Sequence, residues 1–130
     1  MAAYKWCCDA YLNAALSYLS SNATQLVVLK DLGLSAGTDV AYSNLSGHIL
    51  ATVTIDSGDF TQNDGDTSGR KITVAEQASI DIDKTGTAVM VALTNGSDAV
   101  YYVTTCTSQS LESGGTVTVP AWDIELRAPS

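Results

Sequence analysis

The sequence predicts a mainly β protein, namely an antiparallel β-sandwich or small barrel of about seven strands with one amphipathic helix at its N-terminus. Helical periodicity is confined to the first part of the chain. The rest alternates between apolar and polar residues, with turns rich in Gly, Asn and Asp between the alternating segments. With 130 residues and no linker or internal repeat, we expect a single domain over residues 1–130, with the helix at about 4–21 and the β-sandwich at about 25–128.

The N-terminal segment has apolar residues at helical spacing on one side and polar residues on the other. The predicted apolar stripe consists of Tyr4, Cys8, Tyr11, Leu12, Ala15 and Leu19. Together with Trp6 and Tyr18, its aromatic side chains are more than the stripe alone can bury. The helix is therefore expected either to lie across one sheet, which we favour, or to dock on a partner, because Tyr and Trp are enriched at interfaces.

The segments after the helix are typical of short strands. Apolar or alternating runs occupy residues 25–31, 48–56, 70–76 and 78–84. In the last of these runs, Asp81 and Asp83 are expected to face outward. Residues 87–106 have the strongest hairpin signal, with a turn around Asn95–Asp98 and a first arm that is apolar on both faces, as in a central strand.

The last alternating segment contains an irregularity. One phase holds Val117, Val119 and Ala121, and the opposite phase holds Trp122, Ile124 and Leu126. One extra residue at Pro120-Ala121 explains this slip, because a β-bulge supplies one residue and proline lacks the N–H that a central strand needs. We expect a kinked terminal strand with Trp122 near the kink.

The charge of the chain excludes several classes of partner. Its formal net charge is −8 and its pI is about 4.2, so it lacks the cations that bind nucleic acid or an anionic membrane surface. No apolar stretch approaches the roughly 20 residues that span a bilayer. The N-terminus does not resemble a signal peptide, because Asp9 and Asn13 interrupt any apolar run. We expect no nucleic-acid partner, no membrane and no secretion by the standard route.

The segment Thr61–Lys71, TQNDGDTSGRK, is the strongest candidate for a cation site. A calcium loop of the EF-hand type needs alternating oxygen ligands, glycine at the sixth position and a carboxylate at the twelfth. Counted from Asp59, these two positions fall on Asp64 and Arg70; counted from Asp64, the twelfth falls on Ala75. Neither frame closes, so we expect a solvated polar turn between strands.

The residues needed for other site chemistry are also poorly placed. Cys7 and Cys8 would point about 100° apart on a helix and would not easily share a zinc ion, so we expect them and Cys106 to be buried, reduced thiols. The one histidine, His48, is expected at a strand start, exposed or at an edge. Most carboxylates lie in turns or on outward strand faces. We therefore expect no enzymatic activity, no metal and no cofactor.

Two strand patterns resemble those of small virion proteins of tailed bacteriophages. Residues 47–55, GHILATVTI, match a G-x-L-L-A-T-x-T-L type strand, and residues 114–129, GGTVTVPAWDIELRAP, match a terminal G-G-T-V-T-V-x-x-x-x-I-x-L-x-x-P type strand. The similarity covers most of the chain and departs from the pattern in the Cys-Cys pair and in the loop at Ser35–Asn44. It implies a non-enzymatic structural part of the particle, assembled in the bacterial host cytoplasm and located in the virion.

Under this resemblance, the first hypothesis is a capsid decoration or cement protein that bridges major capsid subunits on the outer head surface. Its partner would be the major capsid protein or another virion protein, with a homo-oligomer left open. The candidate interface residues are Tyr4, Trp6, Tyr11 and Trp122. The alternative is a tail or head–tail junction component, which copy number would distinguish.

A third hypothesis is a module that binds carbohydrate or a host surface. Tyr101 and Tyr102, with outward Asp residues, are the residues expected to line such a site. Adjacent strand positions face opposite ways, so we expect at most one of these two tyrosines to join a given platform.

Overall fold

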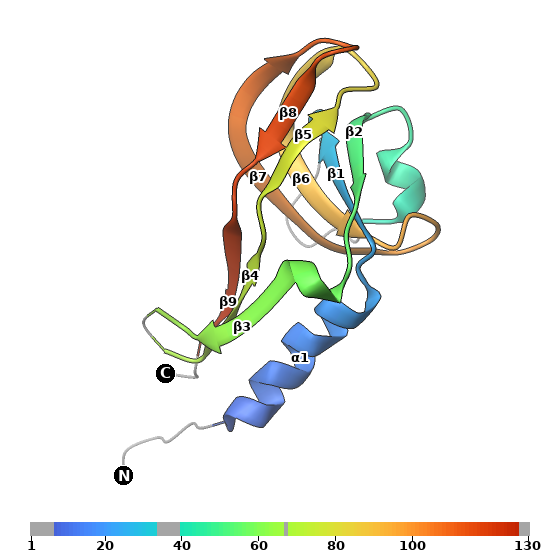
Figure 1. Ribbon diagram of the computed structural model, residues 1–130. Coiled ribbons are helices and arrows are strands. Elements are labelled where there is room, and N and C mark those ends of the chain that lie inside the picture. The colour runs from blue at the N-terminus through green and yellow to red at the C-terminus, as the bar shows by residue number, and fades with distance from the viewer. Residues whose placement is uncertain (1–6, 34–39, 67, 128–130) are drawn as a thin grey trace.

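The computed structural model describes residues 7–33, 40–66 and 68–127 (Figure 1). In this part of the chain, helix α1 (Asp9–Asn22) precedes nine strands, and two short 3₁₀ helices, η1 (Tyr42–Leu45) and η2 (Ser57–Asp59), lie between strands. The prediction of a mainly β protein with one N-terminal helix is confirmed, and the antiparallel sheets are consistent with a β-sandwich or small barrel.

The strands form one large sheet and two small ones. The large sheet has the order β2-β1-β6-β7 and consists of β2 (Ile49–Thr54), β1 (Gln25–Leu29), β6 (Gly86–Thr94) and β7 (Val100–Leu111). The first small sheet has the order β3-β4-β9 and consists of β3 (Phe60–Asp64), β4 (Arg70–Val74) and β9 (Trp122–Leu126). The second pairs β5 (Gln77–Asp81) with β8 (Thr116–Val119). Every one of these strand pairs is antiparallel.

The two small sheets form one bent layer (Figure 1). Strand β4 leads into β5 through Ala75 and Glu76, and β8 leads into β9 through Pro120 and Ala121. Because β8 pairs with β5 and β9 pairs with β4, the layer bends where both long strands are interrupted. The predicted kink at Pro120-Ala121 is confirmed, and the inward phase changes there from Val119 to Ile124.

In the described part of the chain, backbone pairing joins the bent layer to the large sheet on one side. On that side, Ala51 of β2 forms an isolated antiparallel bridge with Ile82, and the Leu50 carbonyl accepts hydrogen bonds from the backbone N–H groups of Asp83 and Lys84. On the other side, β7 pairs with β6 and, within the described residues, with no other strand. The structure therefore resembles a barrel that is closed between β2 and β5 and open between β7 and the β8–β9 strand.

The core occupies both faces of the large sheet. The main cluster fills the space between this sheet, the bent layer and α1, and includes Leu16, Leu26, Leu50, Ile72 and Leu93. A smaller cluster of Val27, Leu29, Leu45 and Ala92 lies on the other face, where η1 contributes Leu45. This second cluster explains why β1 is buried on both faces.

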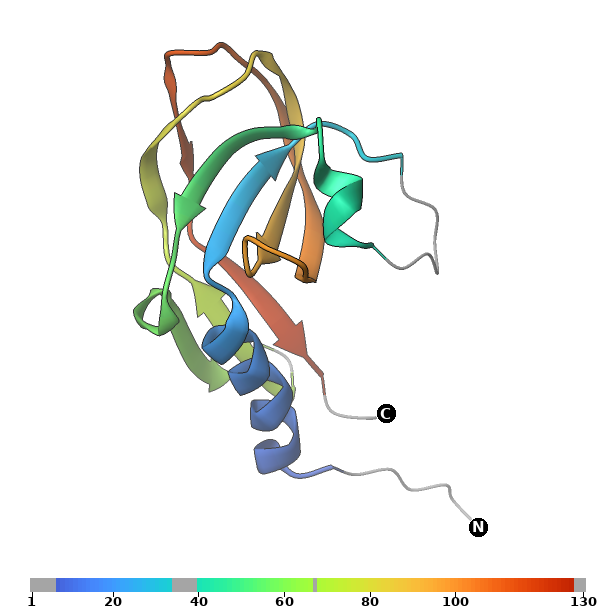
Figure 2. The same cartoon turned by 90° about the vertical axis from the view of Figure 1, so that its right-hand side faces the viewer.

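Helix α1 leads directly into β1 and packs on β3, β4 and η2 (Figures 1 and 2). Its buried side chains are Leu12, Leu16 and Leu19, at the i, i+4, i+7 spacing of one helix face. The predicted stripe was therefore wrong in part, because Cys8, Tyr11 and Ala15 are exposed. The described helix begins at Asp9, and the predicted helical residues 4–6, with Tyr4 and Trp6, lie outside the described residues.

The hairpin between β6 and β7 forms as predicted, with β6 in the centre of its sheet. The Asn95 side-chain oxygen accepts hydrogen bonds from the backbone N–H groups of Ser97, Asp98 and Ala99. Gly96 adopts a φ of 74°, in the left-handed region that glycine tolerates best. The turn is thus held by its own side chain and backbone, which is the reason its sequence signal was clear.

Candidate protein-binding site

The main surface feature is the gap between β7 and the β8–β9 strand, here called the open seam. Two adjoining hollows of about 280 and 270 Å³ lie along it. The residues that line both are Val91, Cys106, Val119 and Pro120. Val28, Ala88 and Val117 add apolar walls to the second hollow. Each is larger than the roughly 150 Å³ cavity that holds a benzene molecule, so each has room for an apolar side chain.

Strand β7 presents an unpaired edge to the open seam. Its 12 residues, VYYVTTCTSQSL, include no charged residue and no proline. Residues 105–110 are all exposed, on both faces of the strand. Natural edge strands usually carry charges, proline or bulges that prevent another strand from pairing with them. The protective features of β7 are bulges: it has two extra residues between the pairs Ala88–Gln109 and Met90–Thr105, and one extra residue between Leu93–Tyr102 and Thr94–Val100.

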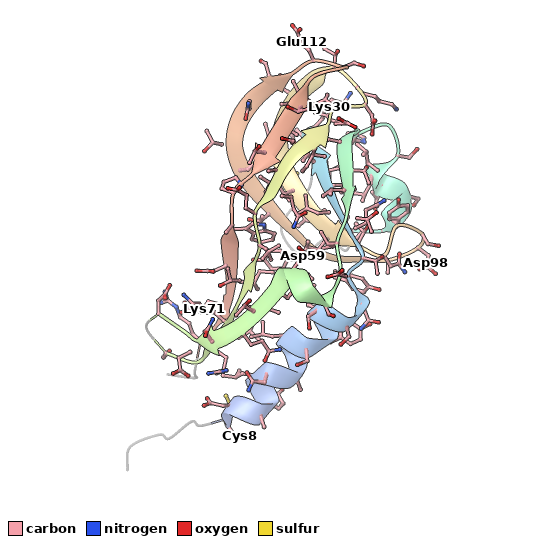
Figure 3. The ribbon with its side chains drawn as sticks, in the orientation of Figure 1. Cys8, Lys30, Asp59, Lys71, Asp98 and Glu112 are labelled. Carbon is pink, nitrogen blue, oxygen red and sulfur yellow. The ribbon has the colours of Figure 1, made fainter. Side chains whose placement is uncertain are left out.

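Two carboxylates that have no ion-pair partner among the described residues lie just beyond the ends of β7, whereas Asp123, across the first hollow, is paired with Lys71. Asp98 lies in the hairpin before the strand and Glu112 directly follows it, at opposite ends of β7 (Figure 3). Both are exposed, and neither forms an ion pair within the part of the chain that the structure describes. The edge is therefore an uncharged strip bounded by a carboxylate at each end.

Trp122, one of the predicted interface residues, lies at the open seam. Its ring packs against the main core cluster and contacts Tyr102 of β7, with ring centroids 5.8 Å apart. It also lines the first hollow. Its Nε1 atom is buried and has no hydrogen-bond partner among the described residues. The contact between Tyr102 and Trp122 is thus a place where side chains bridge the seam that the backbone leaves open.

A second aromatic group lies on α1. Tyr11 and Tyr18 are 71% and 63% exposed and are seven residues apart, so they share one face of the helix. Tyr18 makes an edge-to-face contact with Tyr101, with ring centroids 5.9 Å apart. A third hollow, of about 200 Å³, lies between this helix face and the end of the seam. Its apolar lining includes Ala15, Tyr18, Tyr101, Tyr102 and Leu126.

The expectation that Tyr101 and Tyr102 cannot share a platform is overturned, because both line this third hollow. The pairing register shifts between Leu93–Tyr102 and Thr94–Val100, which leaves Tyr101 without a partner on β6. Such a bulge breaks the strict alternation of side chains.

Of the four predicted interface residues, Tyr11 and Trp122 lie in the described residues, on different surfaces: Tyr11 on the exposed face of α1 and Trp122 at the seam. Tyr4 and Trp6 lie outside the described residues. Sequence reasoning missed Tyr18 and the β7 edge. A signal for the latter was present, since residues 100–111 form a long uncharged run in an acidic chain.

The segment considered as a cation site is a hairpin, in which Thr61–Asp64 belong to β3 and Arg70 and Lys71 begin β4. The predicted polar turn is confirmed only for the short stretch between Asp64 and Arg70. Asp64 pairs with Arg70 at 2.5 Å, and Asp66 pairs with Lys71 at 2.7 Å. The hydrogen bond with Asp66 raises the pKa of Lys71. These carboxylates are thus neutralised by side chains, and among the described residues no group of three or more His, Cys, Asp or Glu side chains is arranged to hold a metal ion.

The Cys7–Cys8 pair, Cys106 and His48 lie on three different segments: before α1, on β7 and directly before β2. Cys8 and Cys106 are exposed and Cys7 is half-buried, so the prediction of buried thiols was wrong. Cys7 and Cys8 precede the first helical residue, and Cys106 lies on the exposed part of β7. Partial burial still raises the pKa of the Cys106 thiol. His48 is half-buried, and its Nδ1 lies 3.0 Å from the Ser46 carbonyl oxygen.

Comparison of the chain with protein-family models, curated proteins and solved structures found no match. Within residues 7–33, 40–66 and 68–127, no helix is long and apolar enough to cross a membrane.

Proposed function

We propose that the protein is a structural protein of a bacteriophage virion, and specifically a capsid decoration protein that bridges major capsid subunits on the outer head surface. The observation that carries this proposal is the open seam, an uncharged strand edge beside apolar hollows on an otherwise acidic molecule. Such a surface suits adhesion to another protein. The resemblance of two strand patterns to those of small phage virion proteins favours the particle as the place where that partner lies.

Adhesion to a capsid requires interface area, because no bond is made or broken. A stable interface buries on the order of 1,600 Å². The seam and the exposed face of α1 adjoin at the third hollow, where Tyr18 and Tyr101 meet, and they provide a continuous surface for such contact. Several copies around a symmetry axis would add avidity to each weak contact. The net charge of −8 suits an outer position, away from packaged DNA.

The test is the composition and strength of phage particles that carry the gene for this chain. We expect quantitative mass spectrometry to find the protein at a copy number comparable with that of the major capsid protein. Particles lacking it should assemble but release DNA at lower temperature. A copy number corresponding to a single ring would favour the head–tail alternative, and absence from purified particles would overturn the proposal.

A carbohydrate-binding module is the second candidate, because Tyr18, Tyr101 and Tyr102 gather around one hollow. Aromatic rings are common platforms for sugar faces, since they are rigid and apolar with polar tips. Binding of the wild-type protein to a glycan array, lost in Tyr18→Ala and retained in Tyr42→Ala, would favour this candidate.

A further inference from the structure

We propose that β7 accepts an extended segment of a partner protein as an added strand, and that this segment is uncharged in its middle and carries Lys or Arg at both ends. This inference rests on the proposed adhesive function and specifies the chemistry of the partner. Adding a strand to an exposed sheet edge is a general mode of peptide recognition, in which backbone hydrogen bonds supply affinity and side-chain pockets supply specificity.

The edge of β7 supplies the backbone groups. The strand is 12 residues long and pairs only with β6 in the described part of the chain, so N–H and C=O groups on its other side face outward in the stretches between and beside its bulges. No charged side chain stands along it. The long run favours a partner segment of similar length, because each added residue pair contributes backbone hydrogen bonds.

The hollows supply the pockets. They lie beside the edge, between Cys106 of β7 and Val119 and Pro120 of the opposite strand. Their walls are mostly apolar, with Val91 lining both hollows and Val28 lining the second. Asp123 also lines the first hollow, and its carboxylate is already paired with Lys71. Successive side chains of an added strand point to opposite faces, so every second residue of the segment would enter the hollows. Small and medium apolar side chains, such as Val or Ile, suit volumes of about 280 and 270 Å³.

The shape of the gap favours a single segment over a folded copy of this chain. Cys106 of β7 and Val119 and Pro120 of the opposite strand line both hollows, so the two edges face each other across them. One extended chain fits there with the pockets on one of its faces. A complete second sheet would have to displace β8 and β9, which are held by pairing with β5 and β4.

Charge also favours a partner segment over a second copy of this chain as the occupant of the seam. Two copies paired antiparallel through β7 would bring Asp98 of one copy near Glu112 of the other, and parallel pairing would oppose each carboxylate with its own equivalent. Like charges placed opposite each other across strands are destabilising. Lys or Arg at the ends of a partner segment would instead meet these carboxylates. The net charge of −8 would also attract such a segment at long range.

The test uses the full-length protein and two matched sets of synthetic peptides. Each peptide has a central run of Val, Ile, Thr and Ser residues in varied order. One set has two Lys residues at each end, and the other has two Glu residues there. Binding is measured by calorimetry and located by amide hydrogen exchange. We expect members of the Lys set to bind and to slow exchange in residues 100–111, and matching Glu peptides to bind about tenfold more weakly.

Thiol labelling gives an independent location. Cys106 lines both hollows, whereas Cys7 and Cys8 lie at the start of α1. A bound Lys peptide should slow maleimide labelling of Cys106 and leave the labelling of Cys7 and Cys8 unchanged. The other two thiols are thus an internal control in the wild-type protein.

Two double variants test the role of the terminal carboxylates. Asp98→Asn with Glu112→Gln should weaken binding of the Lys peptides about three- to tenfold and abolish the preference over the Glu peptides. The control, Asp31→Asn with Glu76→Gln, removes the same charge elsewhere on the surface and should change the preference little. Asn is chosen at position 31 because its side-chain oxygen can still accept the Gly33 N–H bond.

Three results would overturn the inference: absence of protection at β7 with every peptide, equal binding of the Lys and Glu sets, or equal effects of the two double variants. Protection of β7 that rises with protein concentration, without peptide, would show that a second copy is the occupant and would also overturn it. None of these results bears on whether the protein is present in particles, so this inference and the proposed function can fail separately.

Discussion

The two long sides of the molecule differ in how the large sheet meets the rest. On the closed side, the Leu50 carbonyl binds the N–H groups of Asp83 and Lys84, and Ala51 bridges to Ile82. On the open side, β7 has no backbone partner beyond β6 among the described residues, and only side chains such as Tyr102 and Trp122 meet across the gap. The layers are thus joined by backbone pairing on the closed side and by side chains on the open side.

The largest expected contrast is between a core residue of the closed side and a residue of the seam. Leu50 is completely buried, so Leu50→Ala should lower the free energy of unfolding by about 2–5 kcal/mol. Thr107 is exposed and lines the second hollow, so Thr107→Ala should change the free energy of unfolding by less than about 0.5 kcal/mol. Urea unfolding followed by circular dichroism measures both. Equal losses would mean that the seam is part of the stabilising core.

Trp122 tests how much the seam depends on its bridging side chain. Trp122→Ala removes the ring from Tyr102 and from the core, and should cost about 2–3 kcal/mol of unfolding free energy. Trp122→Phe keeps a ring and removes the buried Nε1–H that lacks a partner, which offsets part of the lost area. We therefore expect Trp122→Phe to cost less than about 1 kcal/mol. A Phe variant as unstable as the Ala variant would show that the indole nitrogen is in fact satisfied.

Arg70 joins α1 to the bent layer. Its Nε donates a hydrogen bond to Asn13 Oδ1 of the helix at 2.8 Å, and its guanidinium pairs with Asp64. Arg70→Ala should lower the free energy of unfolding by about 1–2 kcal/mol, because the bond to the helix is partly buried. Arg127, whose side chain is 70% exposed and pairs only with Glu125 among the described residues, is the matched control. Arg127→Ala should lower the free energy of unfolding by at most a few tenths of a kcal/mol.

The smallest expected effect concerns acid. Thr73 Oγ1 donates a hydrogen bond to Asp123 at 2.7 Å, which lowers the pKa of Asp123, and the charge of Lys71 adds to the shift. A lowered folded-state pKa stabilises the fold above the unfolded-state pKa, about 3.9, and this stabilisation is lost as the pH falls through the folded-state pKa.

Thr73→Val should therefore be less stable than the wild type at pH 6, with a difference that shrinks below about pH 4. The urea unfolding midpoints of Thr73→Val and of the wild type, measured at pH values from 6 to below about 4, test this expectation. Thr61→Val, at an exposed position of the neighbouring strand β3, controls for loss of a hydroxyl. A Thr73→Val difference that stays constant with pH would show that the bond to Asp123 contributes nothing to stability.

The sequence by itself determined the local features. Alternation placed Ile80 and Ile82 inward with Asp81 outward, Asn95-Gly96 predicted the hairpin, and Pro120 predicted the kink. Each of these depends on residues that are neighbours along the chain, so the physical cause is present in the sequence. The predicted helix face was wrong at Tyr11 because Leu16 and the sheets, not the helix's own pattern, decide which side is covered.

Only the tertiary structure decided that β7 is an edge and that β8 and β9 stand opposite it without pairing. Alternation shows which side of its own strand a residue faces, but it carries no information on which strand lies alongside, because backbone pairing brings together segments far apart in the chain. The uncharged run from Val100 to Leu111 was visible from the start. It acquired meaning once the fold left one of its edges without a neighbour.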